Sequence, residues 1–518
     1  MTGRTGESWS ICAKIDPVPE TLKEAIAPEE HVAPGAIRGF LGKFTVLQGA
    51  QRELWLTFLI KFLIISAYSV TTKTLTLWLS YDLGFSDQLA GALAGWVWAP
   101  AMTVFTLLAG SFTDAVGLRR TFFLGVFVCI IARTVMVFST VPWLALAGGL
   151  LPLAVGEALG TPVLIAATRR YSTVAQRAIS FSIIYVVMNI GYWAAARIFD
   201  YVRQSLGEHG QFSVFGVQIS TYRTLFLVSL VIEFLVLPFI YFLRRGAEAT
   251  GEGVRFTAEP SRYPTGTLFD KIFLTARDSA RDTLALFRRL LGQSGFYRLL
   301  AFLLLIGFLK LIFLQMDYVF PKFGIRELGG GAPIGQLSAI NYILIIILVP
   351  VIGALTQKYS AYRMVIVGGV ICAASVFVMA LPTAWFQTMA QGVIGQWLGH
   401  WYLGVRGNIH PYYVMIAIYI SIFSLGEAFY SPRVYEYAAA IAPRGQEASY
   451  GALSYIPFLI GKLLVGTGGW LLAAFCPEHG PRNSGMMWLI FALAASIAPL
   501  GLIVFRPYIR VPEAGRQE

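Results

Sequence analysis

Long apolar segments alternate with short polar ones along most of this chain. Each apolar segment has about 20 residues, which lets a helix cross a hydrocarbon layer about 30 Å thick. The pattern predicts twelve membrane spans, at 54–80, 88–112, 121–140, 143–166, 178–200, 222–243, 298–320, 337–357, 363–384, 411–437, 449–474 and 485–506. We therefore predict an all-α polytopic membrane protein, since the strands of a membrane β-barrel would be shorter and would alternate in polarity.

A long polar segment in the middle of the chain divides the predicted spans into two sets of six. The expected parts are a tail at 1–53, an N-terminal half at 54–243, a linker at 244–297, a C-terminal half at 298–506 and a tail at 507–518. In the linker, apolar residues recur at helical spacing between Phe269 and Leu291. This spacing predicts an amphipathic helix on the membrane surface or under the helix bundle, or else a helix that binds a partner.

Composition and charge agree with a membrane protein. Charged residues make up 13% of the chain, against about 25% in soluble domains. Lys and Arg gather in alternate loops, and by the positive-inside rule these loops and both termini are cytoplasmic. We therefore expect an integral protein of the plasma (inner) membrane. The formal net charge of +12 fits an anionic lipid surface, so the lipid bilayer, and not nucleic acid, is an expected partner.

Enzyme chemistry finds little support in the sequence. All five histidines fall in the first tail or in predicted outer loops, and the four cysteines are scattered. No catalytic triad, metal-ligand spacing or phosphate-binding loop is evident in the sequence. We predict that the chain is not an enzyme and uses no metal or cofactor.

Two loops at equivalent places in the halves are related. The second predicted span is followed by GSFTDAVGLRR at 110–120, and the eighth is followed by GALTQKYSAYR at 353–363. The segment at 110–120 resembles the cytoplasmic loop signature of the major facilitator superfamily. It matches that signature at Gly110, Asp114, Gly117, Arg119 and Arg120. An Asp at a helix end can pair with Arg or with a helix N-terminus, so we predict a latch between the halves, with an ordinary basic loop as the alternative. The resemblance implies two six-helix halves that rock about a central site.

Four spans are similar to those of the proton-dependent oligopeptide transporters, a family within that superfamily. The segments that carry the resemblance are GEALGTP (156–162), FSIIYVVMNIG (181–191), INYILIIILVP (340–350) and GEAFYSP (426–432). The resemblance implies secondary active transport by alternating access, with proton-coupled uptake of peptides or peptide-like zwitterionic solutes. It also implies that Glu427 binds the ammonium end of a peptide and that Asn189 and Asn341 hydrogen-bond its peptide groups. Interhelical contacts are the alternative for the two Asn residues.

The chain departs from that family in two places. Thr161 stands where the fourth span of the family usually has Lys. Lys61, Ile64 and Ile65 stand where the first span has a Glu-x-x-Glu-Arg cluster implicated in proton coupling. This loss leaves open a transporter or exporter of another amphipathic small molecule, with different or no proton coupling. A receptor or scaffold that has the transporter fold but moves nothing is a further alternative, and in each case we expect a monomer.

Five ionisable residues lie near the middle of predicted spans, where each must face a cavity or a partner. They are Glu157, Glu233, Lys310, Glu427 and Lys462. Together they predict a charge-compensated substrate cavity, in which Lys462 or Lys310 replaces the missing fourth-span Lys beside Glu427. Structural ion pairs are the alternative. The candidate substrate-binding set is completed by Tyr68, Thr161 and Tyr455, of which the two tyrosines would line side-chain pockets.

A further pair of charges lies in the outer third of the first helices of the two halves. A salt bridge between Lys73 and Asp317 would close the outer side and would open when the cavity faces outward. The alternative for Lys73 is snorkelling to the outer interface. Asp317, Glu427 and Glu157 are the candidate sites for a coupling proton, and we expect a structural role for Arg133 in the third span.

Overall fold

Twelve helices of the computed structural model are long and apolar enough to cross a membrane, which confirms the all-α membrane fold and the predicted number of spans. The structure describes residues 47–214, 216–250, 253–256, 268–356, 358–441 and 456–511. The chain divides into two compact units, Met1–Gly49 and Ala50–Glu518. All helices and strands named below belong to the second unit.

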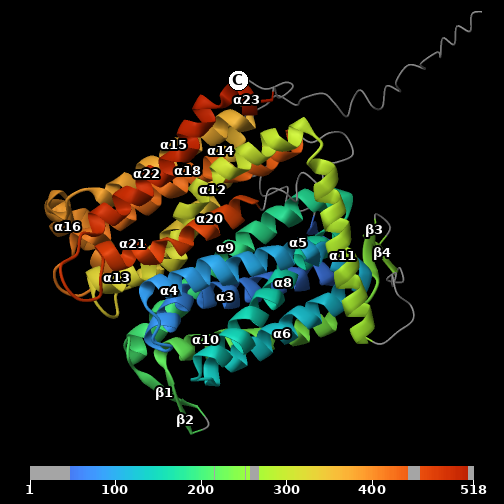
Figure 1. Ribbon diagram of the computed structural model, residues 1–518, viewed down its shortest axis with the longest axis horizontal. Coiled ribbons are helices and arrows are strands. Elements are labelled where there is room, and N and C mark those ends of the chain that lie inside the picture. Colours follow the sequence, from blue (N-terminus) through green and yellow to red (C-terminus); the bar gives the residue numbers. More distant parts are fainter. Residues whose placement is uncertain are drawn as a thin grey trace, which may run out of the picture. The chain divides into compact units, whose positions relative to one another are not determined.

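Six spans form the N-terminal half (Figure 1). The first, third, fifth and sixth are the helices α3 (Arg52–Tyr81), α6 (Leu118–Phe138), α9 (Val174–Leu206) and α10 (Thr221–Phe242). The second span joins α4 (Asp87–Ala92), the π-helical turn η2 (Leu93–Trp98) and α5 (Ala99–Val116). The fourth joins α7 (Pro142–Leu144), η3 (Ala145–Leu150) and α8 (Leu151–Tyr171).

The other six spans form the C-terminal half. The seventh, eighth, tenth and twelfth spans lie in α12 (Ser294–Tyr318), α14 (Ile334–Leu355), α18 (Pro411–Ile441) and α22 (Ser484–Val504). The ninth joins α15 (Ala361–Phe377) to η4 (Val378–Ala380), and the eleventh joins α20 (Ile456–Gly466) to α21 (Gly468–Phe475). Shorter helical pieces outside the spans are α13 (Phe320–Leu328), η5 (Thr383–Phe386), α16 (Gln387–Gln391), α17 (Val393–Gln396), η6 (Trp397–Tyr402) and α23 (Arg506–Ile509).

Two small antiparallel hairpins lie outside the spans and were not predicted. They pair β1 (Gln211–Val214) with β2 (Val217–Ser220), and β3 (Ala247–Thr250) with β4 (Gly253–Phe256). Each strand has four residues, so the hairpins are local additions to a helical membrane fold.

Polar side chains fix where several spans begin. Thr173 and Gln176 form a capping box at the start of α9. The hydroxyls of Ser220 and Ser360 accept hydrogen bonds from backbone N–H groups in the first turns of α10 and α15, which satisfies donors that have no partner within the helix. Between α5 and α6, Gly117 has a φ of 93°. This conformation favours glycine, so one residue turns the chain from the second span into the third.

The two halves meet along several helices. Among the described elements, α9 packs against α14, α20 packs against η2 and α5, and α3 packs against α12 and α13. The helix predicted in the linker is present as α11 (Leu268–Leu290) and packs against α5 (Figure 1). Its place on the membrane surface stays a prediction.

Glycines bring two pairs of neighbouring helices close together in the same way in each half. Each contact combines a Gly and a Cys, four residues apart on one helix, with a Gly on the other helix. The residues are Gly125, Cys129 and Gly156 between α6 and α8, and Gly368, Cys372 and Gly426 between α15 and α18. A Cβ atom at position 426 would lie 2.6 Å from Cys372 Sγ and 2.8 Å from the backbone oxygen of Gly368. The close approach therefore requires glycine at this position.

We expect the substitution Gly426→Ala to lower the stability of the fold by about 1–3 kcal/mol, because the added methyl group forces α15 and α18 apart. The measurement is the midpoint of thermal unfolding of the purified protein in detergent. Gly353→Ala is the matched control, since a Cβ atom at this position in α14 meets nothing within 4 Å. Equal midpoints for the two variants would contradict the packing argument.

Candidate functional site

A buried carboxylate and a buried amide meet in the C-terminal half. Glu427 lies on α18 and Asn341 on α14. Asn341 Nδ2 donates hydrogen bonds of 3.0 Å to Glu427 Oε2 and to Ser424 Oγ. Glu427 is 5% exposed and Asn341 is 1% exposed, so these bonds form away from bulk water. They hold the carboxylate in place without neutralising its charge.

Lys310 on α12 provides a positive charge near this carboxylate. Its Nζ lies 3.4 Å from Ser431 Oγ, and 5.0 and 4.8 Å from the ring centroids of Tyr430 and Phe458. The aromatic faces stabilise the ammonium group, which is also attracted electrostatically by Glu427. The described structure contains no direct ion pair between Lys310 and Glu427. Opposite charges that are near each other but held by separate partners can bind the two ends of a zwitterion.

Two further buried lysines have no hydrogen-bonding or ionic partner among the residues that the structure describes. Lys462 on α20 is 4% exposed and Lys61 on α3 is 5% exposed. A buried ammonium group in a membrane needs an anion or water near it. Lys462 therefore stays a candidate residue of the substrate site. Lys61 joins it as a candidate, although the sequence marked it only as a departure from the family pattern.

Ion pairs join the two halves, between α3 and α12 and between α4 and α13. Lys73 Nζ lies 2.7 Å from Asp317 Oδ1, so the structure contains the salt bridge that the sequence led us to expect. Asp87 lies 2.7 Å from Lys322 Nζ and 2.8 Å from Arg326 Nη2. These are the ion pairs between the halves in the described part of the chain, and they lie on the side opposite the linker. Burial lowers the pKa of Lys322, and attraction to Asp87 opposes this effect.

Asp200, near the end of α9, joins the halves on the same side. Its carboxylate oxygens accept hydrogen bonds of 2.9 and 2.7 Å from the backbone N–H groups of Gly335 and Gln336, at the N-terminus of α14. A carboxylate is favourable there because the helix dipole and the unpaired N–H groups attract negative charge. Arg197 adds a hydrogen bond to the side chain of Gln336. Sequence reasoning missed these contacts, because no motif marks a carboxylate that caps a helix in the other half.

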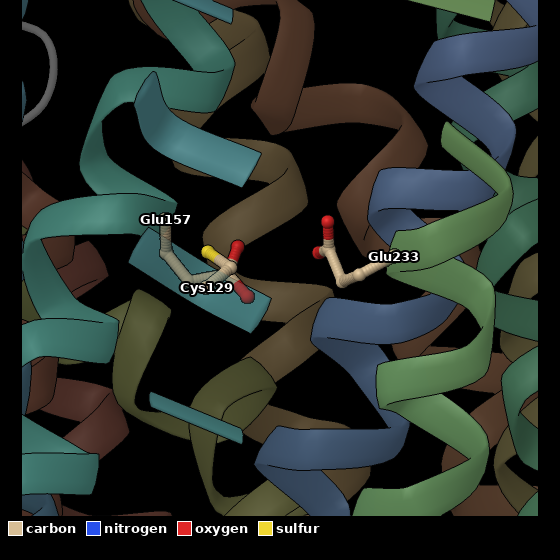
Figure 2. Close-up of side chains that lie close together, drawn as sticks. All are labelled: Cys129, Glu157 and Glu233. Atoms are coloured by element: carbon tan, nitrogen blue, oxygen red, sulfur yellow. The ribbon is translucent and has the colours of Figure 1, made fainter. Parts of the chain in front are cut away.

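Arg133 lies between two glutamates inside the N-terminal half. Its Nη2 is 2.5 Å from Glu157 Oε1, and its Nη1 is 3.1 Å from Glu233 Oε1. Thr71 Oγ1 accepts a further bond from Nη2 at 3.3 Å. Figure 2 shows the carboxyl groups of Glu157 and Glu233 reaching toward each other from α8 and α10. The sequence grouped both acids with Glu427 in one cavity, whereas the structure pairs them with Arg133 instead.

Two other predicted site residues contact neighbours within the N-terminal half. Asn189 Nδ2 donates to the backbone oxygen of Tyr185, in its own helix, at 2.9 Å. Tyr68 stacks on Trp98 with ring centroids 6.4 Å apart. These contacts leave a role in substrate binding as a prediction for both residues.

Other predictions concern residues for which the structure gives little. Tyr455 and the side chains of Thr161 and Asp114 lie outside what the structure describes. Of the latch residues, Arg119 has its guanidinium carbon 5.3 Å from the ring centroid of Tyr241, which is in the same half. The latch between the halves therefore stays a prediction.

The chain matches a family model in sequence and solved transporter structures in fold. The family model of the Major Facilitator Superfamily matches residues 57–408, and no curated protein sequence matches the chain. A solved POT family transporter in complex with 5-aminolevulinic acid is 14% identical with a TM-score of 0.66, over 89% of this chain and 97% of that one. A bacterial homologue of the human drug peptide transporters is 17% identical with a TM-score of 0.61, over 88% and 98%. A structure on substrate recognition in proton dependent oligopeptide transporters is 18% identical with the same TM-score and coverage.

We expect Asp317→Asn to weaken closure on the side opposite the linker by about 3–5 kcal/mol, because it leaves the buried charge of Lys73 unpaired. Spin labels at Ser213→Cys, on the exposed strand β1 of the N-terminal half, and at Asn408→Cys, on an exposed loop of the C-terminal half, report the opening as longer distances between the labels. Asp82→Asn is the control, since this acid is hydrogen-bonded within the N-terminal half. Unchanged distances in Asp317→Asn would show that the ion pair does not hold the halves together.

Proposed function

Because the chain belongs to the Major Facilitator Superfamily, we propose that it is a secondary active transporter whose two halves rock to give alternating access. The observation that carries the proposal is the buried acid and base of the C-terminal half. Glu427 and Lys310 each have a hydroxyl or amide partner, and the described structure shows no ion pair between them. Separated charges inside a membrane protein mark a site for a substrate or an ion.

We propose peptides or peptide-like zwitterionic solutes as the substrate class. Glu427 binds the ammonium group, Lys310 binds the carboxylate with Lys462 as a second cation, and Asn341 orients Glu427. Two solved structures of similar fold support this class. One is in complex with 5-aminolevulinic acid, which has an amino and a carboxyl group, and the other concerns proton dependent oligopeptide transporters.

We place the linker side of the protein in the cytoplasm and the protein in the plasma (inner) membrane, because basic residues gather in the loops of this side. The ion pairs between the halves then close the outer side, which leaves the substrate site to be reached from the cytoplasm. Uptake requires Lys73 and Asp317 to separate, so that the site opens outward, and to pair again after loading. A proton gradient drives this cycle in the inward direction.

The test removes one charge from the protein and the matching charge from the ligand. The measurement is exchange of a labelled dipeptide across proteoliposomes in the presence of an unlabelled competing dipeptide. We expect N-acetylation or C-terminal amidation of the competitor to weaken its inhibition of this exchange at least about 10-fold, since each modification removes a charged contact. In Glu427→Gln the penalty for N-acetylation should disappear while the penalty for amidation stays. In Lys310→Gln the reverse is expected.

Glu248→Gln and Lys358→Gln make the same changes at exposed positions and serve as matched controls, in which both penalties should stay. If no dipeptide competes while another amphipathic solute is exchanged, the proposed substrate class is wrong. If no solute is exchanged at all, a receptor or scaffold becomes the better account.

A further inference from the structure

In the N-terminal half, the buried cluster of Arg133, Glu157 and Glu233 contains one more carboxylate than cation. Among the described residues, Arg133 is the cation in contact with Glu157 and Glu233. The three side chains are 0%, 5% and 1% exposed, respectively. With both glutamates ionised, the group has a net charge of −1 inside the membrane, where an uncompensated charge is strongly unfavourable.

One oxygen of the group has no partner among the residues that the structure describes. Glu233 Oε2 is buried and forms no hydrogen bond with any of them, while Figure 2 shows the carboxyl groups of Glu157 and Glu233 directed toward each other. A carboxylate oxygen that is buried without a donor is unfavourable. A protonated carboxyl group is neutral and can donate a hydrogen bond itself. Ligand oxygens of the two glutamates lie within 4.8 Å of each other, so the geometry fits one proton on this pair of carboxyl groups.

The other described groups that face the two glutamates supply no positive charge. Cys129 faces them from α6, and Tyr68 faces Glu157 from α3. The helices α5 and α9 also pack near α8 and α10, but their described side chains place no charge in electrostatic contact with the pair. A proton is thus the cation that brings the group to neutrality.

A metal ion does not fit the same residues. Ligand atoms of Cys129, Glu157 and Glu233 lie within 4.8 Å of one another, a spacing that would suit a metal. The guanidinium of Arg133 already contacts both carboxylates. A divalent ion placed among them would be repelled by this neighbouring positive charge.

A small cavity adjoins the glutamates. It has a volume of about 10 Å³ and is lined, among others, by Thr121, Gly125 and Cys129 of α6 and by Gly156, Glu157 and Gly160 of α8. This is about the volume that one water molecule requires. The cavity reaches from Glu157 toward Thr121. Thr121 lies in the first turn of α6, and this end of the helix is on the linker side. A water molecule in it can exchange a proton with the glutamates.

We propose that Glu157 and Glu233 share one exchangeable proton and form the proton-coupling site of this protein. On release, the O–H bond of the protonated carboxyl group breaks, the proton passes to water in the cavity, and both carboxylates face Arg133. On uptake, the same bond forms again and the group returns to neutrality. The coupling role rests on the proposed transport function, whereas proton binding at this site does not.

The helix α3 connects this site to the ion pair between the halves. Thr71 Oγ1 accepts hydrogen bonds from Nε and Nη2 of Arg133 at 3.4 and 3.3 Å. Lys73, two residues later on α3, pairs with Asp317 of the other half. A change in charge that moves the guanidinium therefore acts on the helix that bears one side of the gate.

Infrared difference spectroscopy of the protein in lipid tests proton binding without any substrate. We expect the wild-type protein at neutral pH to show the carbonyl band of a buried protonated carboxyl group, and to lose this band as the pH rises. Glu157→Gln and Glu233→Gln should each abolish the band, because Arg133 then balances the single remaining carboxylate. Both substitutions keep the shape of the side chain, and two variants guard against the misfolding of one.

Asp87→Asn is the spectroscopic control, because this carboxylate already contacts two cations and its loss should leave the band unchanged. A band that persists in either glutamine variant would assign the proton to another residue. A wild-type protein without the band would have both glutamates ionised. Either result overturns the proposal.

Transport measurements test the coupling role. We expect Glu233→Gln to retain exchange of labelled dipeptide across proteoliposomes, while accumulation driven by a pH gradient falls to the level reached without a gradient. Accumulation that is undiminished in this variant would remove the coupling role. If the wild-type protein exchanges no dipeptide, the substrate class proposed above is wrong, and the infrared result decides the proton site alone.

Discussion

The cost of an unpaired charge inside a membrane governs how both halves of this protein are built. On insertion scales, a charged residue at the centre of a span costs about 2.5–3.5 kcal/mol. Apolar packing gives little compensation, because lipid tails are as apolar as the helix surfaces. Glu427 is therefore bonded to Asn341, and Lys73 of one half finds Asp317 of the other. Many contacts between spans therefore join polar or charged side chains that are hydrogen-bonded or ion-paired with each other.

The two halves place one glutamate each in the same local frame. GEALGTP on α8 and GEAFYSP on α18 begin with a glycine that packs against a helix bearing Gly and Cys, so Glu157 and Glu427 occupy corresponding positions. Their cations differ. Arg133 on α6 contacts Glu157, whereas Val376 holds the corresponding place on α15 and Lys310 approaches Glu427 from α12. In the function that we propose, one frame thus serves a proton in one half and an ammonium group in the other.

The positions of the membrane spans were predictable from the sequence. A contact between helices was predictable only where two opposite charges lie at the same depth in the membrane. The twelve spans follow from length and hydropathy. The pairing of Lys73 with Asp317 follows because both lie at the same depth on the first helices of equivalent halves. The contacts of Arg133 with two glutamates do not follow, because the sequence does not state which spans pack together within a half. The repeated Gly-Glu-Ala and Thr/Ser-Pro pattern signals that Glu157 and Glu427 hold equivalent positions, but it does not show that Glu157 contacts Arg133 of the third span.

The proton site that we propose lies in one half, and the proposed substrate site lies in the other. Coupling between them would have to pass through a contact that both halves share. Arg133 acts on α3 through its bond to a hydroxyl group of that helix. Lys310 and Asp317 lie seven residues apart on one face of α12, so a substrate carboxylate at Lys310 acts on the helix that bears Asp317. Lys73 and Asp317 join α3 to α12. In the proposed cycle this ion pair is therefore the contact that both the proton site and the substrate site can influence, which is what coupled transport requires of a gate.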